Sequence, residues 1–129
     1  MLIHYDVPMI LYSETISIFL QKTKADLKHI MFHEMGLSVQ RNYFLYNGYR
    51  TPFSLVVFEN NQQLGYFIPD QYRIGLNKKL IYVAKETIIK NILRHELAHF
   101  ICYLENGVNV LPHGAEFKAI CERFAWDSE

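Results

Sequence analysis

Cysteine is scarce in this chain of 129 residues, which contains only Cys102 and Cys121. Two cysteines cannot form the disulfide framework of a small secreted protein. No Cys-x-x-Cys pair occurs either, so we expect neither a thioredoxin-like redox motif nor a C-terminal zinc ribbon. This cysteine usage is typical of a reduced compartment, and we expect a cytoplasmic protein.

An excess of either charge is also absent, because 13 Lys and Arg residues balance 13 Asp and Glu residues. A nucleic-acid-binding domain usually shows a basic excess or a basic stripe. The short basic groups at residues 22–28 and 78–79 are therefore interpreted as solvated surface. The net charge of zero gives no support for a nucleic-acid partner.

Long apolar runs are missing too. No stretch approaches the 18 or more apolar residues of a membrane span. The first 14 residues are apolar, but they lack a basic start and include Asp6 and Pro8, which argues against a signal peptide. We therefore expect no membrane partner.

The composition indicates one folded domain. Half of the residues are hydrophobic and 15% are aromatic, which is enough apolar surface for a packed core. We find no internal repeat, low-complexity stretch or linker, and the length suits a single domain. The predicted domain is 1–129.

Three helices are predicted from the spacing of apolar residues. The first begins after Ser13, which can cap it, and runs to about residue 35, where Gly36 is a natural stop. The second, over residues 84–106, is apolar on most sides, as expected for a buried central helix that ends at Gly107. The third covers residues 115–126.

A small antiparallel sheet is predicted between the first two helices. Residues 53–58 and 64–69 are two β-prone runs around a polar turn, which predicts a hairpin, and residues 71–77 read as a third strand. Residues 37–50 are ambiguous and could contain a short strand with an Asn47-Gly48 turn. The predicted fold class is α+β.

The stretch RHELAHF, residues 94–100, carries a His-Glu-x-x-His motif on the central helix. His95 and His99 are four residues apart, so they lie on one helix face and can bind one ion together. Their imidazoles suit Zn²⁺, which in catalytic sites takes three protein ligands and keeps one open position. Glu96 lies about 100° round the helix, where it borders that face and can act as general base on a zinc-activated water.

The histidines also allow other interpretations. The alternative for residues 95–99 is a set of satisfied core side chains, but a buried apolar helix should not hold two histidines and a glutamate without a partner. His29 and His33 share the same spacing, but the only adjacent glutamate follows the second histidine. We interpret that pair as surface residues near a helix C-terminus.

A third ligand is needed. Cys102 and Glu105 stand where the metzincin pattern requires Gly and His, which excludes that class. His113 follows His99 by 14 residues, enough for the helix to end, turn and return. A glutamate from the last helix, Glu116 or Glu122, is the alternative, and His113 is preferred because it completes a three-histidine site.

HELAHF followed by PHGAEFKAICERF resembles the SprT-like zinc metallopeptidase family, which includes the Spartan proteases. That family carries His-Glu-x-x-His and then a His-Gly-x-x-Phe segment opening the next helix. The resemblance is strongest over residues 70–125. It implies a zincin-like fold, with metal ligands His95, His99 and His113, and Glu96 as the catalytic acid-base. It also implies that an edge strand binds an extended peptide, either the third strand or one strand of the hairpin.

The predicted function is zinc-dependent hydrolysis of peptide bonds in a protein or peptide substrate. One alternative is a zinc-binding module of the same fold with gated or no proteolysis, acting with nucleic-acid or protein partners as some family members do. Another is a zinc ion that only staples two helices, with Cys102 or Glu116 closing the fourth position. Hydrolysis of a non-peptide amide is a further option. Tyr103 could donate to an oxyanion, although packing is the simpler role for it.

Overall fold

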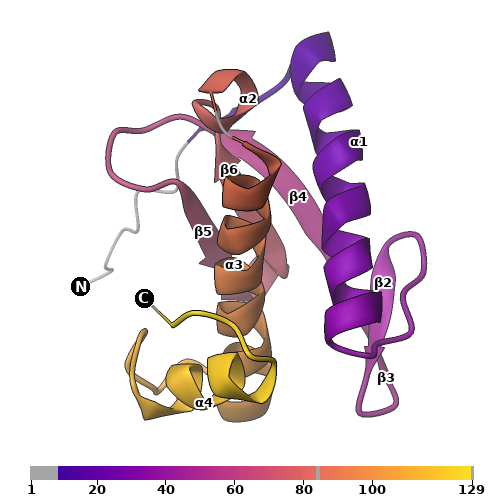
Figure 1. The fold of residues 1–129 in the computed structure, drawn as a ribbon, viewed down its shortest axis with the longest axis vertical. Coiled ribbons are helices and arrows are strands. Elements are labelled where there is room, and N and C mark those ends of the chain that lie inside the picture. The colour runs from indigo at the N-terminus through magenta and orange to yellow at the C-terminus, as the bar shows by residue number, and fades with distance from the viewer. Residues whose placement is uncertain (1–8, 84, 129) are drawn as a thin grey trace.

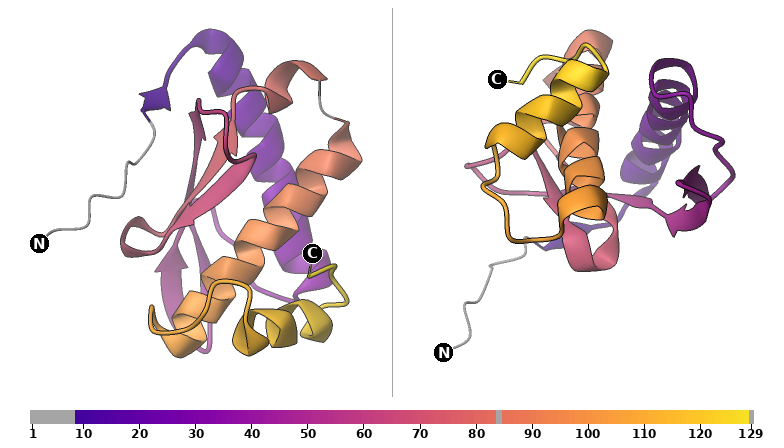
Figure 2. Two further views of the ribbon diagram at one scale, coloured as in Figure 1. Left: turned by 90° about the vertical axis from the view of Figure 1, so that its left-hand side faces the viewer. Right: turned by 90° about the horizontal axis from the view of Figure 1, so that it is seen from below.

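The computed structural model describes residues 9–83 and 85–128. Helices α1 (Glu14–His29) and α3 (Glu86–Asn106) pack side by side on one face of a four-stranded sheet (Figures 1 and 2). The predicted α+β class is confirmed. The expectations for residues 1–8 lie outside the described part of the chain.

Helix α1 begins and ends as its sequence predicts. The Ser13 hydroxyl accepts a hydrogen bond of 3.1 Å from the Ile16 N–H, which satisfies one of the free donors at the helix start. The last turn, η1 (Ile30–Glu34), is a π-helical turn, and Gly36 follows it at a φ of 69°. A left-handed glycine is the usual way to end a helix.

The sheet has the strand order β1-β4-β6-β5. Its strands are β1 (Ile10–Leu11), β4 (Ser54–Phe58), β5 (Gly65–Ile68) and β6 (Arg73–Asn77). The predicted hairpin of residues 53–58 and 64–69 is wrong, because β6 lies between β4 and β5. Since β6 runs parallel to β4 and antiparallel to β5, the sheet is mixed and not wholly antiparallel as predicted.

Burial explains why β6 takes the inner position. Its side chains Ile74 and Leu76 are fully buried in the core, which an inner strand achieves more easily than an edge strand. Buried Asn77 at its end donates to the carbonyl oxygens of Asn60 and Gln63, at 3.0 and 2.8 Å. These bonds hold the loop that connects β4 to β5. The loop spans the end of β6, because β6 lies between these two strands.

A separate hairpin is formed by β2 (Tyr43–Tyr46) and β3 (Tyr49–Pro52), beside the C-terminal end of α1 (Figure 1). Asn47 and Gly48 connect the strands at φ values of 50° and 82°. Two positive φ angles in succession are what a two-residue turn matching the twist of a hairpin requires. The Asn47-Gly48 turn considered for this ambiguous region is therefore present.

The chain returns to the helical layer through the short helix α2 (Leu80–Val83) and then α3. Helix α3 ends at Gly107, which has a φ of 73° and donates to the Tyr103 carbonyl at 2.8 Å. Helix α4 (Ala115–Arg123) crosses the C-terminal end of α3 (Figure 1), and ends three residues earlier than predicted. Among the described residues, no helix has the length and hydrophobicity needed to cross a membrane.

Candidate metal centre

The structure brings three histidines together at the junction of α3 and α4. His95 and His99 lie one turn apart on α3, and their Nε2 atoms are 3.2 Å apart. His113 precedes α4, and its Nε2 lies 3.1 Å from the Nε2 of each of the other two. His113 lies in a tight turn between Leu111 and Gly114. The turn is closed by a hydrogen bond of 3.0 Å from the Gly114 N–H to the Leu111 carbonyl.

Hydrogen bonding does not explain this triangle of nitrogens. A neutral imidazole nitrogen is either one donor or one acceptor in the plane of its ring, so three of them cannot all satisfy two neighbours each. A zinc ion about 2.0–2.1 Å from each nitrogen would separate the nitrogens by roughly 3.3–3.4 Å in tetrahedral geometry. The distances of 3.1–3.2 Å are close to that value, so the group could hold a metal ion.

Phe117 packs against all three imidazoles. Its ring centroid lies 5.1 Å from that of His95, 4.4 Å from that of His99 and 5.0 Å from that of His113. The side chain is fully buried on the first turns of α4. It therefore limits the ring orientations of residues from two different segments.

The surroundings keep the histidines on α3 neutral. Burial, followed by the proximity of His95 and His113, lowers the pKa of His99 to about 4. Burial and then His113 lower the pKa of His95 as well. Neutral imidazoles present a free lone pair, which is the form that binds a metal.

Glu96 borders this group and is buried, with 6% of its surface exposed. Burial raises the pKa of its carboxyl group to about 8. A cation on the histidines would act in the opposite direction and favour the carboxylate. Strand β5 lies directly against this side chain: a Cβ atom added at Gly65 would be 3.2 Å from Oε2 of Glu96 and 2.8 Å from Cγ2 of Ile92.

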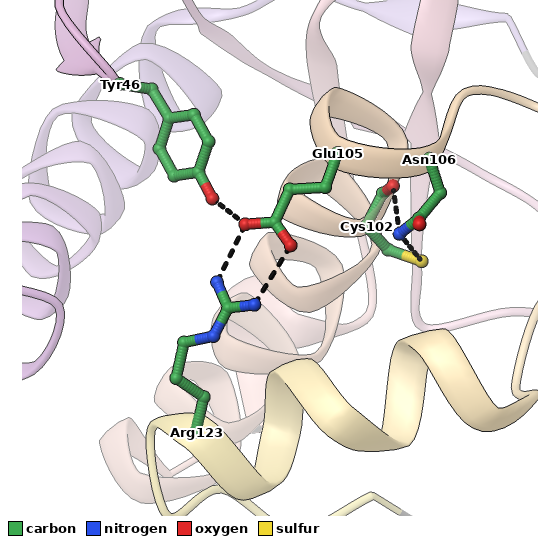
Figure 3. A network of polar contacts seen from close by, with 5 residues as sticks. All are labelled: Tyr46, Cys102, Glu105, Asn106 and Arg123. Atoms are coloured by element: carbon green, nitrogen blue, oxygen red, sulfur yellow. Dashed lines mark hydrogen bonds and ion pairs between the residues drawn. The ribbon is translucent and has the colours of Figure 1, made fainter.

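Two ion-pair networks hold α4 and the segment after it against the rest of the fold. Glu105 on α3 accepts two hydrogen bonds from Arg123 on α4, at 2.7 and 2.9 Å, and one from the Tyr46 hydroxyl (Figure 3). Glu34 accepts two hydrogen bonds of 2.8 Å from Arg94 and one of 2.9 Å from the Trp126 indole. Glu105 is therefore engaged with Arg123 and Tyr46, and it is not a member of the potential ligand group formed by the three histidines.

The other candidate residues lie elsewhere or have other contacts. Cys102 is buried, as expected for a small hydrophobic residue, and its carbonyl and Sγ both contact the Asn106 amide (Figure 3). Tyr103 packs with Phe67 and Tyr72, at centroid distances of 6.0 and 6.1 Å. Glu116 is exposed and forms no hydrogen bond with the three histidines in the described part of the chain.

The second histidine pair is at the surface, as predicted. His29 and His33 are both exposed, and their ring centroids are 4.2 Å apart at the end of α1 and in η1. Among the described residues, they belong to no group of three potential metal ligands. Glu122 is also exposed and outside the histidine group.

Sequence reasoning missed two residues that shape the site. Phe117 is part of the His-Gly-x-x-Phe segment, so its position was visible, but no contact with the imidazoles was expected of it. The sequence did not predict a contact between Gly65 and Glu96. A glycine inside a strand can indicate a bulge or a close approach, but it does not indicate which residue approaches. Its proximity to Glu96 depends on how β5 packs on α3.

An α+β domain with two histidines of a His-Glu-x-x-His helix and a third from the next segment defines a candidate metal centre of the metallohydrolase type. The chain belongs to the SprT-like family, whose sequence model matches residues 37–127. Helices packed on a small sheet, with the motif on the central helix, agree with the general architecture expected from the resemblance.

Known proteins resemble parts of the chain. Protein SprT of Shigella boydii serotype 18 (strain CDC 3083-94 / BS512) is 38% identical over 53 residues, which make up 41% of this chain. The matched segment spans 32% of the length of that relative. The crystal structure of the metallopeptidase zymogen of Pyrococcus abyssi abylysin is similar over 84% of this chain and 77% of its own, with 18% identity and a TM-score of 0.44.

Proposed function

We propose that this domain is a zinc-dependent peptidase, with His95, His99 and His113 as metal ligands and Glu96 as general base. The observation that carries the proposal is the triangle of three Nε2 atoms 3.1–3.2 Å apart beside a buried carboxyl group. Membership of the SprT-like family supports the same chemistry.

The donor set suits a catalytic ion. Among the described residues, the group contains three histidines and no fourth side chain, which leaves a coordination position for water or substrate. A zinc ion held there would supply Lewis acidity, lowering the pKa of a bound water toward about 7 and polarising a carbonyl. A zinc that only staples two helices would instead need Cys102 or Glu116 as a fourth ligand, and neither belongs to the group.

Glu96 is proposed to move the proton. Its carboxylate would accept a proton from the attacking water and pass it to the leaving amine. Burial raises the pKa of this carboxyl group and a cation on the histidines would lower it, so the two effects together would set how readily Glu96 takes up and releases the proton. The edge strand β5, which brings Gly65 against Glu96, keeps bulk water away from one side of the carboxyl group.

The same strand is the proposed binding site for an extended substrate. β5 is an edge strand, whereas β6, which the sequence offered as an alternative, lies inside the sheet. A peptide that adds to the open edge of β5 would run past Glu96, because Gly65 lies at the start of this strand. Main-chain pairing of this kind binds peptides of many sequences.

A second candidate is a zinc-binding module of the same fold whose proteolysis is gated by a protein or nucleic-acid partner. The observation that favours it is the 6% exposure of Glu96. A base buried to this degree has little direct access to substrate, so a small rearrangement at β5, which lies against it, could control that access. The balanced net charge offers no support for nucleic acid as that partner.

The decisive experiment compares the wild type with Glu96→Gln. We expect about one zinc per chain in both proteins by elemental analysis, and cleavage of a fluorescein-labelled unfolded protein only by the wild type, because the amide keeps the shape of the side chain but cannot accept the proton. Equal activity in the two proteins would remove Glu96 from the mechanism. Retained metal without activity in the wild type would favour the gated module.

A matched pair of histidine variants tests the ligand set in the same assay. His113→Ala should lose zinc, whereas His33→Ala, from the exposed pair with similar helical spacing, should keep it. Zinc retained in full by His113→Ala would show that the metal is bound elsewhere.

A further inference from the structure

We propose that the groove between α1 and the open edge of β4 binds an extended peptide of a partner protein, with acidic residues at the C-terminal end of the peptide. This groove is separate from the histidine site: it borders β4, whereas β5 lies next to Glu96 and the inner strand β6 separates the two (Figure 1).

The groove has the size of a short extended segment. Its volume is about 360 Å³, and one wall is a stripe of α1 that runs from Ser13 to Lys24. Eleven residues of helical rise correspond to about 17 Å. An extended chain covers this length with about five residues. The opposite wall is formed by Phe53, Ser54 and Leu55.

The backbone of β4 offers one open pairing position inside the groove. The Ser54 N–H donates to the Tyr72 carbonyl, and the Phe58 carbonyl accepts from the Lys78 N–H, so residues 54, 56 and 58 direct their backbone groups toward β6. Strand residues alternate, so Leu55 and Val57 direct theirs to the other side.

Only part of that other side is covered. β1 pairs with β4 at Val57 and Phe58 and goes no further along the strand. In the described part of the chain, no hydrogen bond occupies the N–H and C=O of Leu55 on this side. An unpaired edge position beside a groove is where an added strand pairs.

Positive charge at one end of the groove favours a ligand with acidic residues. Lys24 lies there, with its Nζ 2.9 Å from Oδ1 of Asn42 and 5.6 Å from the Phe53 ring centroid. Burial, then Lys28, then Arg41 lower the pKa of Lys24. Among the described residues these three cations form no ion pair, and no acidic side chain lines the groove. A carboxylate from a ligand would relieve their mutual repulsion.

A peptide fits these features better than a nucleic acid. The positive charge is confined to one end, and the walls carry hydroxyl, amide and apolar groups, whereas a phosphate backbone needs cations along its whole length. A strand added antiparallel to β4, as β1 is, runs from the Val57 side toward Phe53. Its C-terminal end then lies nearest Lys24, which sets the polarity of the acidic residues.

The experiment measures binding of a fluorescein-labelled hexapeptide, Val-Thr-Val-Thr-Glu-Glu, to the full chain. Every protein carries Glu96→Gln so that the peptide remains intact. We expect saturable binding that weakens with salt, with the Leu55 amide among the shifted signals in an NMR titration. Lys24→Glu should weaken binding by about tenfold or more. Lys22→Glu, an equal charge change on an exposed residue of the same helix, should leave binding unchanged.

The order of the peptide is a second test that needs no protein variant. Glu-Glu-Val-Thr-Val-Thr should bind more weakly, because its acidic end lies far from Lys24. The proposal is overturned if Lys24→Glu binds like the parent, if the Leu55 amide does not respond, or if the reversed peptide binds equally well. It is also overturned if a single-stranded oligonucleotide shifts the groove residues and the hexapeptide does not.

Discussion

At the scale of single residues, the site depends on two side-chain positions that neither bind a metal nor carry a proton. Phe117 packs under three imidazoles, and Gly65 leaves room for the Glu96 carboxyl group. Both act by restricting where another side chain can lie, which is how supporting residues tune a metal site. Each therefore has an effect that can be separated from stability.

Replacing Gly65 with Ala should lower kcat and leave the zinc content unchanged. The new methyl group would lie 2.8 Å from Ile92 Cγ2, which must move, and 3.2 Å from Glu96 Oε2, which must give way slightly. A misplacement of about 1 Å costs about a hundredfold in rate, so this smaller shift of the base should cost roughly threefold to tenfold. Combining the change with Ile92→Ala, which removes the closer obstacle, should restore part of kcat. A kcat that stays at the wild-type value in the single variant would contradict this role.

Phe117→Leu should weaken zinc binding by about tenfold, because the flat ring that orients the three imidazoles is lost. The substitution should also reduce the free energy of unfolding by about 1 kcal/mol. Phe19→Leu, in the core under α1, is the matched control: a similar loss of stability is expected with unchanged zinc affinity. Competition with a chelator measures the affinity, and equal effects of the two variants would contradict the assignment.

At the scale of secondary-structure elements, polar side-chain networks connect the helices in addition to their apolar contacts. Arg94 precedes the motif histidine on α3 and binds Glu34 of η1, and the same carboxylate accepts from Trp126 after α4. The hydrogen bonds from Arg94, with a smaller contribution from Trp126, hold the pKa of Glu34 below its ordinary value despite partial burial.

This lowered pKa predicts a specific dependence of stability on pH. Because the folded-state pKa of Glu34 is depressed, its contribution is complete above the unfolded-state pKa of about 4.5 and is lost as the pH falls through the folded-state value. Glu34→Gln should therefore cost about 1 kcal/mol at pH 7 and less at pH 3. Chemical denaturation at both pH values measures this, with Glu122→Gln, an exposed acid outside both networks, as the control. A cost that is the same at both pH values would rule out the ionic contribution.

The positions of the strands could be predicted from the sequence, but their pairing could not. The strands predicted at residues 53–58, 64–69 and 71–77 are present as β4, β5 and β6 with slightly shorter bounds, and the Asn47-Gly48 turn considered for residues 37–50 is present. The pairing of β4 and β5 was not predicted correctly, because adjacent strands with a polar loop usually form a hairpin, whereas here β6 is inserted between them. Which strand occupies the inner place depends on burial across the whole sheet.

At the scale of the whole molecule, the candidate metal centre joins α3 to the segment that opens α4. Other contacts hold this junction together as well. Phe117, Ile120 and Cys121 of α4 are buried in the common core, and Arg123 is paired with Glu105. Small domains that need zinc to fold lack such a core.

Removing the metal should consequently abolish activity without unfolding the chain. After treatment with a chelator we expect unchanged far-ultraviolet circular dichroism at 25 °C and a melting temperature lower by about 10 °C, since a ligand at about a hundred times its Kd adds roughly 2.7 kcal/mol. Adding zinc back should restore both melting temperature and activity. Unfolding on chelation would instead support a stapling role for the metal.

The sequence by itself determined the features that depend on neighbours along the chain. Helical spacing placed His95 and His99 on one face, and Ser13, Gly36 and Gly107 marked helix ends. These follow from local geometry, in which a residue's neighbours three or four positions away are set by the helix itself. His113 was preferred for its separation of 14 residues from His99, and the resemblance to the SprT-like family implies the same residue.

The tertiary structure alone decided the strand order, the contact of Gly65 with Glu96, the position of Phe117 under the imidazoles and the open edge at Leu55. Each of these joins segments that are far apart along the chain. Such contacts are selected by the packing of the whole core, in which one strand order buries the apolar side chains of β4 and β6 beneath α1 and α3. No local pattern of residues carries that information.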